Sequence, residues 1–422
     1  MSAQPLVPFW QNPCGLPSRP GLGQRACAFF GARYVLGPVK ETIQLVHGPV
    51  GCGYYGRLVR GVPYPLYTTA LTEKEVVFGG LDHLARALRE AFALNPEARG
   101  AFVYLSCVSG LIGEDVAGLA RLFEEKGLPV KTVACPGFSS FSQAGGHALA
   151  YEVLLGLVKP GPLAEEPTVN LLGEYNVAGE ARVIKGLLEG LGVKVHTVLT
   201  GETSWSELEA LTRAHLNLLL CGSTAQALAK ELKSRFGMPF ERVSFYGPAA
   251  IARSLKKMAT FFGLPEKKVL LQIRKGEDRL QKVLPSYKDL LSGRRALLLL
   301  GAGKLGPLAR MLRELGLEVV AAGSIFGREE DHQELRAYTD LVSDNPTEDE
   351  LEYLLKFLKP DVVLTNARDQ WRPIKLGFPT LSFPQTVDRG PYTGYEGFVN
   401  LARDLVKVIS APVWRFFARD QS

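Results

Sequence analysis

The stretch Cys27–Arg60, CAFFGARYVLGPVKETIQLVHGPVGCGYYGRLVR, places two cysteines on glycine-rich segments beside a His-Gly-Pro corner. A cysteine flanked by glycine can present its sulfur and nearby backbone N–H groups to a bulky anion, because glycine lacks the Cβ that blocks close approach. Iron–sulfur clusters are such anions, and thiolates hold them. A third cysteine, Cys107, follows the apolar run 101–106. We therefore expect Cys27, Cys52 and Cys107 to converge from three separate turns.

A simpler interpretation of these cysteines stays open on the residues alone. Free cysteine is often a small buried hydrophobe, and no CxxC pair is present. The spacing by itself does not decide between buried thiols and cluster ligands.

The composition is that of a globular protein large enough for two or three domains, with 422 residues of which 46% are hydrophobic and 22% charged. No apolar run is long enough to span a bilayer, and the N-terminal segment lacks the pattern of a secretory signal. Six cysteines in such a chain favour free thiols in a reducing cytoplasm over disulfides. The net charge of +6 comes from scattered basic residues, so we expect an acidic partner or an anionic ligand and no nucleic acid.

Apolar strand-like runs alternate with amphipathic helical patterns along most of the chain. This alternation predicts parallel sheets with helices on both faces. The early part of the pattern predicts one helix at 75–94, a strand at 101–106 and a second helix at 114–126. The fold class is therefore α/β, with three doubly wound, Rossmann-like domains. The expected divisions are an N-terminal arm (1–26), a first domain with the three cysteines (27–160), a second domain with Cys221 (161–290), and a third domain with a C-terminal helix (291–422).

Ligands of such sheets bind beyond the carboxyl ends of the strands. Cys107, Cys135, Cys221 and Lys304 all follow predicted strands. Cys221 also precedes a predicted helix, whose dipole would stabilise a thiolate, with a nucleophilic or merely buried cysteine as the alternative. We expect Lys304 to point its ammonium group from a flexible turn into a central anion site. Whether Cys14 and Cys135 are ligands or spectators stays open, and of the two Cys135 is the better candidate to line the pocket.

Other motifs have weaker functional interpretations. The run Gly301–Gly306, GAGKLG, matches the dinucleotide-binding pattern GxGxxG, but the candidate ribose partner Glu318 precedes its strand instead of ending it. A cluster-free nicotinamide-dependent dehydrogenase is therefore the weakest hypothesis. His147 is a candidate proton donor and Gln143 a candidate ligand-fixing amide, with helix capping or packing as the alternative for both.

Several motifs together resemble one known family. They are CAFFGA, LVHGPVGC, TEKEVVFGG, SCVSGLIGED, NLLGEYNVAGE, VSFYG and GPYTGYEGF, in this order along nearly the whole chain. The chain resembles the alpha-type subunits of the nitrogenase component 1 superfamily. The resemblance implies that Cys27, Cys52 and Cys107 are ligands of a [4Fe-4S] or P-cluster-like iron–sulfur cluster at a subunit interface, because three ligands from one chain leave a place for a partner's residue.

The same resemblance implies a second metal group and two partners. Cys221 matches the thiolate that holds one end of a large iron–sulfur cofactor of the iron–molybdenum type, or its precursor. Four further residues match positions that line the cofactor pocket, namely Arg60, Gln143, His147 and Lys304. The implied partners are a beta-type (NifN- or NifK-like) subunit in an α2β2 assembly and an ATP-dependent iron-protein reductase.

One departure from the family pattern decides which member we expect. Catalytic subunits have a histidine as the second cofactor ligand shortly before Gly-Pro-Tyr, whereas Ser382–Tyr392 reads SFPQTVDRGPY. Gln385 is a candidate weak second contact. A cofactor held by one thiolate is easier to hand on, which favours a NifE-like assembly scaffold. The rival hypothesis is a nitrogenase-like reductase acting on a small substrate, in which His147 delivers protons while Arg60 and Gln143 position ligands.

Overall fold

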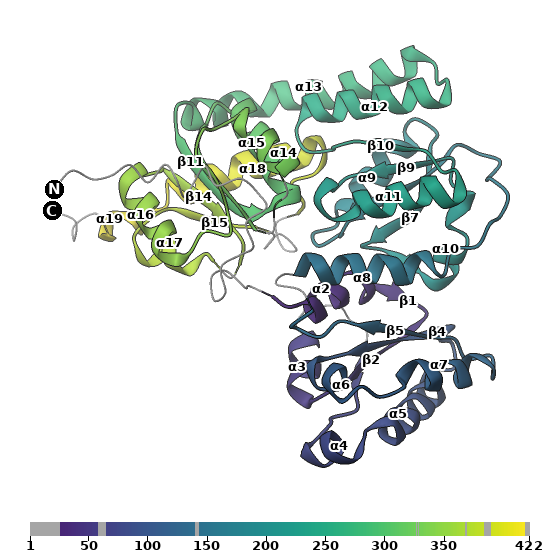
Figure 1. The fold of residues 1–422 in the computed structure, drawn as a ribbon. Helices are drawn as coiled ribbons and strands as arrows, with labels where there is room; N and C mark the ends of the chain where they lie inside the picture. The colour runs from purple at the N-terminus through teal and green to yellow at the C-terminus, as the bar shows by residue number, and fades with distance from the viewer. Residues whose placement is uncertain are drawn as a thin grey trace.

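The computed structural model describes residues 26–57, 65–139, 143–325, 327, 329–367, 369–383 and 390–417. Three separate parallel sheets follow one another along the chain, as the colour gradient in Figure 1 shows. Their strand orders are β3-β2-β4-β5, β10-β9-β6-β7 and β13-β12-β11-β14-β15. The α/β fold with parallel sheets is therefore confirmed.

The first sheet is built from short, buried strands that alternate with helices. Its strands are β2 (Thr42–His47), β3 (Leu66–Thr68), β4 (Gly100–Leu105) and β5 (Val130–Ala134). Its helices are α2 (Ala28–Leu36), α3 (Val50–Arg57), α4 (Glu73–Phe78), α5 (Leu81–Leu94), α6 (Cys107–Ile112), α7 (Val116–Glu124) and α8 (Gln143–Leu155).

The single helix predicted at 75–94 is wrong, because it is divided into α4 and α5. Gly79 has a φ of +93°, which ends α4, and Gly80 precedes the first residue of α5. Glu114 stabilises this break by accepting hydrogen bonds from the backbone N–H groups of Gly80 and Leu81. The same carboxylate lies 2.9 Å from Nε2 of the buried His47 at the end of β2. Glu114 therefore joins the start of α5 to the carboxyl end of a central strand.

The second sheet contains β6 (Thr168–Glu174), β7 (Lys194–Thr200), β9 (Leu216–Leu219) and β10 (Phe240–Arg242). Its helices are α9 (Glu180–Glu189), α10 (Trp205–Glu209), the 3₁₀ turn η1 (Leu211–Arg213) and α11 (Gly222–Phe236). A small ladder pairs β1 (Val39–Lys40) with β8 (Thr203–Ser204) and joins the first two units. Two long helices, α12 (Pro248–Phe262) and α13 (Glu266–Leu291), lead to the third unit.

The third sheet contains β11 (Arg295–Gly301), β12 (Glu318–Ile325), β13 (Val342–Asp344), β14 (Val362–Thr365) and β15 (Thr380–Ser382). Its helices are α14 (Ala302–Glu314), α15 (Glu329–Arg336), α16 (Glu348–Leu358), α17 (Trp371–Lys375), α18 (Gly394–Ile409) and α19 (Trp414–Phe417). The centre of β11 is apolar at every position and does not alternate between apolar and polar residues, because both of its faces are buried. Leu298 and Leu300 pack into one core, and Leu297 and Leu299 pack into the core on the other face.

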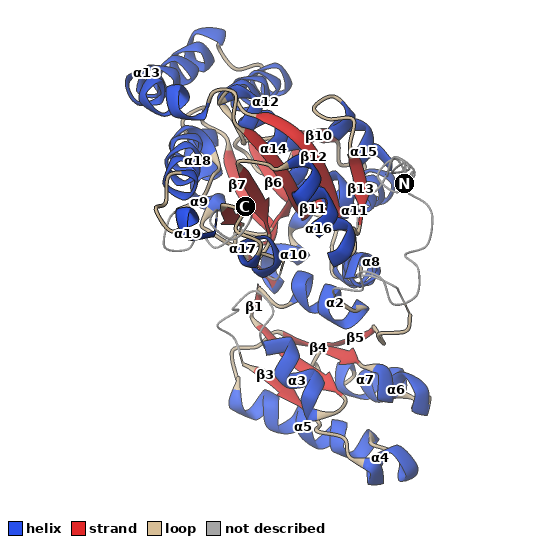
Figure 2. Ribbon diagram, turned by 90° about the vertical axis from the view of Figure 1, so that its left-hand side faces the viewer, coloured by secondary structure: helices blue, strands red, loops and turns tan. Residues whose placement is uncertain are grey.

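The three units share hydrophobic cores. One core continues from the second sheet through α13 to the third sheet and α18. Another joins α2 and α8 to Leu172 and Leu219 of the second sheet, and Figures 1 and 2 both show these two helices between the first sheet and the rest of the molecule. Helices α2 and α8 of the first unit and the carboxyl ends of the second and third sheets can therefore contribute to one site. Across the described ranges, every helix is too short or too polar to cross a bilayer.

Candidate functional site

Cys27, Cys52 and Cys107 come from three different helices of the first unit. Cys27 is the N-cap residue of α2, Cys52 lies in α3, and Cys107 is the first residue of α6. Burial raises the pKa of the Cys52 thiol, and the neighbouring thiols Cys107 and Cys27 raise it further. The three sulfurs are thus close enough to influence one another, as expected for residues that converge from separate turns.

Gly137 brings two of these cysteines together. Its N–H donates a hydrogen bond to Sγ of Cys107 at 3.0 Å. A Cβ at this position would lie 3.1 Å from Sγ of Cys107 and 3.4 Å from Cβ of Cys27. Backbone N–H groups that point at thiolate sulfurs are a feature of iron–sulfur sites.

Cys135, whose role the sequence left open, lies with this group and does not line the cavity around Cys221. It follows β5, is fully buried, and its pKa is raised by burial and then by Cys27 and Cys107. No three His, Cys, Asp or Glu side chains of the described residues form a site for a single metal ion. A cluster carries its own iron and sulfide and is held by thiolates at its corners, so its ligands lie further apart than those of one ion. The donor set therefore fits a cluster better than a single ion.

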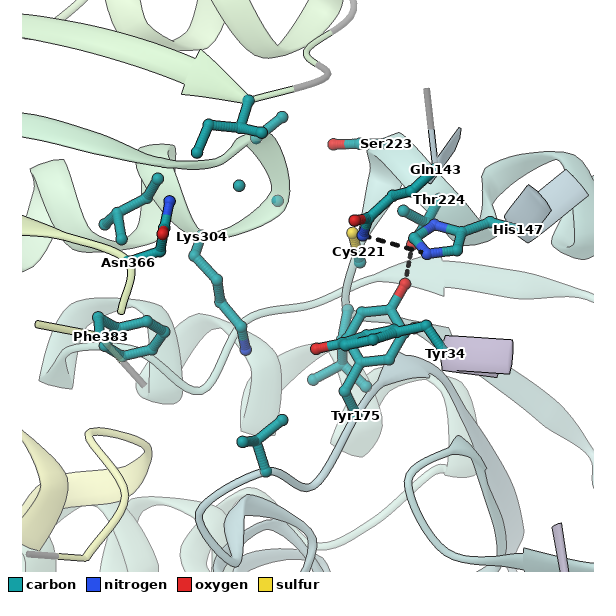
Figure 3. A pocket seen from close by; sticks show the side chains of 18 of the residues that line it. Tyr34, Gln143, His147, Tyr175, Cys221, Ser223, Thr224, Lys304, Asn366 and Phe383 are labelled. Atoms are coloured by element: carbon teal, nitrogen blue, oxygen red, sulfur yellow. Dashed lines mark hydrogen bonds between the residues drawn. The ribbon is translucent and has the colours of Figure 1, made fainter. Parts of the chain in front are cut away.

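A cavity of about 510 Å³ lies where the three units meet. The first unit contributes Phe30, Tyr34, Gln143 and His147 to its wall, and the other walls come from the carboxyl ends of β6, β9, β11 and β14. Figure 3 shows the side chains of Cys221, His147 and Lys304 around this space. The structure thus brings together four residues that the sequence analysis placed at one pocket, namely Gln143, His147, Cys221 and Lys304. Arg60 and Gln385 lie outside the described residues.

Cys221 occupies a narrow position between the second and third units. It is the N-cap residue of α11 and 7% exposed. A Cβ at Gly173, whose φ is +79°, would lie 2.7 Å from Cβ of Cys221, and a Cβ at Gly303 would lie 2.3 Å from its Sγ. The N-terminus of α11, which carries a partial positive charge, lies beside this thiol. The cavity therefore contains one thiol that two glycines and a helix terminus hold in position.

Lys304 lies in the first turn of α14 and not in a flexible turn. Its Nζ donates to the Tyr246 hydroxyl at 2.6 Å and lies 3.9 Å from Oε2 of Glu174. Burial alone would lower the pKa of Lys304, but the carboxylates of Glu174 and Glu180 and the Tyr246 hydroxyl raise it above its ordinary value. Lys304 is therefore a fixed positive charge at the wall of the cavity.

The described wall of the cavity contains three carboxylates, and the sequence analysis had named none of them as pocket residues. Lys304 is its single lysine or arginine, and Glu174, Glu180 and Asp369 are acidic. Two of these carboxylates also stabilise the loop 174–180, because Glu174 accepts a hydrogen bond from the N–H of Asn176 at 2.8 Å and Glu180 from the N–H of Ala178 at 2.7 Å. The backbone N–H groups of this loop therefore partly neutralise the negative charge of Glu174 and Glu180.

An aromatic group lines the cavity near Cys221, as Figure 3 shows. The rings of Tyr34 and Tyr175 lie 5.0 Å apart, and the His147 ring lies 5.8 Å from Tyr34. The side-chain nitrogen of Gln143 lies 3.4 Å from Nε2 of His147, as Figure 3 shows. Sequence reasoning did not single out Tyr34, Tyr175 or Tyr246, although Tyr175 and Tyr246 lie in two of the motifs that carry the family resemblance, NLLGEYNVAGE and VSFYG.

The GxGxxG run lacks space for a dinucleotide. The position of a Cβ at Gly303 is taken by Sγ of Cys221, and a Cβ at Gly306 would lie 2.5 Å from Oε1 of Glu334. Protein side chains therefore pack against these two glycines, where a pyrophosphate would have to approach a dinucleotide-binding turn. This packing argues against the dehydrogenase hypothesis.

Comparisons with known proteins identify the family. The profile of the family described as "Nitrogenase component 1 type Oxidoreductase" matches residues 27–410. The nitrogenase molybdenum-iron protein alpha chain of Methanothermobacter marburgensis is 35% identical, over 95% of this chain and 91% of that protein. The nitrogenase iron-molybdenum cofactor biosynthesis protein NifE of Methanococcus maripaludis is 36% identical, over 95% of this chain and 87% of that protein. The two kinds of relative are thus equally similar to this chain.

A solved structure agrees with these sequence matches. The structure described as "Nitrogenase Cp1 at pH 5" superimposes with a TM-score of 0.87 at 27% identity and covers 95% of this chain and 91% of that chain. The profile match, the two relatives and this superposition agree over nearly the whole chain, and they show that it belongs to the nitrogenase component 1 family.

Proposed function

We propose that this chain is the alpha-type subunit of a NifE-like scaffold, on which an iron–sulfur cofactor of the iron–molybdenum type, or its precursor, is matured. The observation that carries this proposal is Cys221, the single thiol among the described residues of the cavity wall, combined with a segment before Gly390 that contains no histidine. A group with one protein thiolate as its anchor is released more easily than a group with two anchors. Release is what a scaffold needs.

The rest of the cavity supports reversible binding. Lys304 offers a fixed ammonium group, and Gln143 and His147 offer groups that can donate hydrogen bonds from the opposite wall. Arg60 and Gln385 complete the proposed set from the sequence alone. When bound, the cofactor supplies the iron and sulfide that later carry out redox chemistry.

The second metal group of the proposal is a [4Fe-4S] or P-cluster-like cluster on Cys27, Cys52 and Cys107, which transfers electrons from an ATP-dependent iron-protein reductase. Members of the family hold iron–sulfur clusters and work with a beta-type subunit and an iron protein. Exposed apolar side chains lie beside these cysteines in the chain, where a partner could cover them. They are Val50 and Tyr54 of α3, Leu111 of α6, and Phe138, which are 65%, 70%, 75% and 60% exposed. A beta-type subunit on this face would bury these side chains and supply a fourth ligand, in an α2β2 assembly.

One observation favours a second candidate, a catalytic subunit of a nitrogenase-like reductase. His147 is buried beside Gln143 at the cavity wall, where it could deliver protons to a small substrate. In that case the loaded pair would turn over and keep its cofactor.

The deciding experiment is anaerobic copurification with the beta-type partner, followed by iron quantitation and EPR after addition of the reductase, ATP and small substrates. A scaffold gives cluster signals, a transferable cofactor and no product, whereas product formation with the cofactor retained shows a reductase. Cys52→Ala should remove the interface cluster and weaken pairing. Cys221→Ala should keep that cluster and lose only the large cofactor, so full cofactor iron in Cys221→Ala would refute the anchor.

A further inference from the structure

A second cavity, of about 320 Å³, lies on the other side of Gly303 from the first. The two cavities share the wall residues Leu220, Ser244, Ala302, Gly303 and Pro307. The second cavity contains none of the cofactor residues discussed above and has a different chemical character. Its charged wall residues are Arg242, Arg253, Lys257, Arg310, Asp331 and Glu334.

Basic side chains outnumber the acidic ones in this wall, and two of them share one carboxylate. Glu334 serves two guanidinium groups at once, with Arg242 at 2.8 Å and Arg310 at 3.2 Å. Lys257 pairs with Glu241 at 2.9 Å. Arg253 has no hydrogen bond or ion pair with any described residue, although its charge acts on Glu314. The carboxylate of Glu334 therefore fixes two arginines in place, and Arg253 remains available to a ligand.

The backbone adds to the positive potential of the cavity. The first turns of α11, α12 and α14 contribute Gly222, Ala250 and Gly303 to the wall, and none of these three turns contains an acidic residue. Each helix N-terminus carries a partial positive charge that usually attracts an acidic side chain or a bound anion. The guanidinium carbon of Arg242 would lie 3.6 Å from a Cβ at Gly222, which places this arginine beside the first turn of α11.

We propose that this basic cavity binds a small polyanion with at least two anionic oxygens, such as phosphate or a short dicarboxylate. Arginine pairs such oxygens two at a time, and the volume lies near the lower end of small-molecule sites, which favours a small anion. A bound anion would lie between the second and third units and would stabilise their packing. The proposal does not depend on what occupies the first cavity.

The test uses the full chain, purified in a chloride buffer without polyanions and titrated calorimetrically with inorganic phosphate and, separately, with malonate. Saturable binding of either probe that weakens as the chloride concentration rises supports the site, and the preferred probe separates an oxyanion from a dicarboxylate. Thermal unfolding should show an unfolding temperature that rises with the concentration of the bound probe.

Two variants locate the binding. Arg253→Gln should weaken it about tenfold, because it removes a charged donor to the anion, and Lys257→Gln should weaken it less, because the Lys257 ammonium already pairs with Glu241. Lys267→Gln on the exposed side of α13 removes the same charge outside the cavity and should leave the affinity unchanged. Unfolding without ligand shows whether each variant is folded. The proposal is wrong if neither probe binds, if both cavity variants keep the original affinity, or if Lys267→Gln loses as much as they do.

Discussion

Gly303 and Cys221 touch across the boundary between the second and third units, since a Cβ at Gly303 would lie 2.3 Å from Sγ of Cys221. The two residues come from the first turn of α14 and the N-cap of α11. The absence of a side chain at Gly303 is therefore what leaves room for the thiol beside the cavity.

Gly303→Ala should lower the free energy of unfolding by about 1–3 kcal/mol, because the added methyl group must displace the sulfur or the helix. It should also reduce the iron retained by the cofactor cavity. Gly186→Ala in α9 is the matched control, since no atom lies within 4 Å of a Cβ there and the residue does not line the described cavity wall. Denaturant unfolding and iron analysis measure both effects, and equal behaviour of the two variants would contradict the contact.

Gly137→Ala should disturb the three-cysteine group and leave the cofactor cavity intact. The new methyl group would lie 3.1 Å from Sγ of Cys107, so the sulfur or the loop must move. We expect less iron in the copurified pair and a weaker EPR signal from the interface cluster. Gly186→Ala, in α9 of the second unit, adds the same methyl group where nothing lies within 4 Å, and its iron content should not change.

Glu114→Ala should destabilise the first unit by about 1–3 kcal/mol, because it leaves the N–H groups of Gly80 and Leu81 and a ring nitrogen of His47 without their acceptor. Glu90→Ala on the exposed side of α5 is the control and should change stability by less than about 0.5 kcal/mol. Urea unfolding of the three proteins measures the difference. A Glu114→Ala variant as stable as the control would show that water replaces these bonds.

The carboxylate of Glu75 should make stability depend on pH in an acidic window. Hydrogen bonds from the Thr72 hydroxyl and backbone N–H lower its pKa from 4.5 to about 2. Because the folded-state pKa is the lower one, this stabilisation is complete above pH 4.5 and is lost as the pH falls towards 2. Between pH 4.5 and 2 the stability of Glu75→Gln should therefore fall less steeply than that of the wild type. Glu73→Gln, at an exposed position of the same turn, should reproduce the wild-type curve.

The local sequence was sufficient to predict the strands and helix starts that position Cys107, Cys135 and Cys221. The run Ala296–Leu300 predicted a buried strand, and β11 buries it on both faces. Cys107, Cys135 and Cys221 were expected at carboxyl ends of strands, and all three lie there, because a buried strand followed by a helix start is visible in neighbouring residues. The break at Gly79 and Gly80 escaped this reasoning, since it depends on a positive φ and on Glu114, which lies more than thirty residues away in the chain.

The sequence by itself determined the α/β class, the succession of parallel sheets and the thiols at their carboxyl ends, because each depends on patterns within a few turns of chain. The tertiary structure alone decided that Cys135 lies with the three cysteines, that Lys304 faces Glu174, and that four basic side chains surround a second cavity. These relationships arise where separate units pack together. Residues far apart in the chain meet there, and no local pattern records the distance between them.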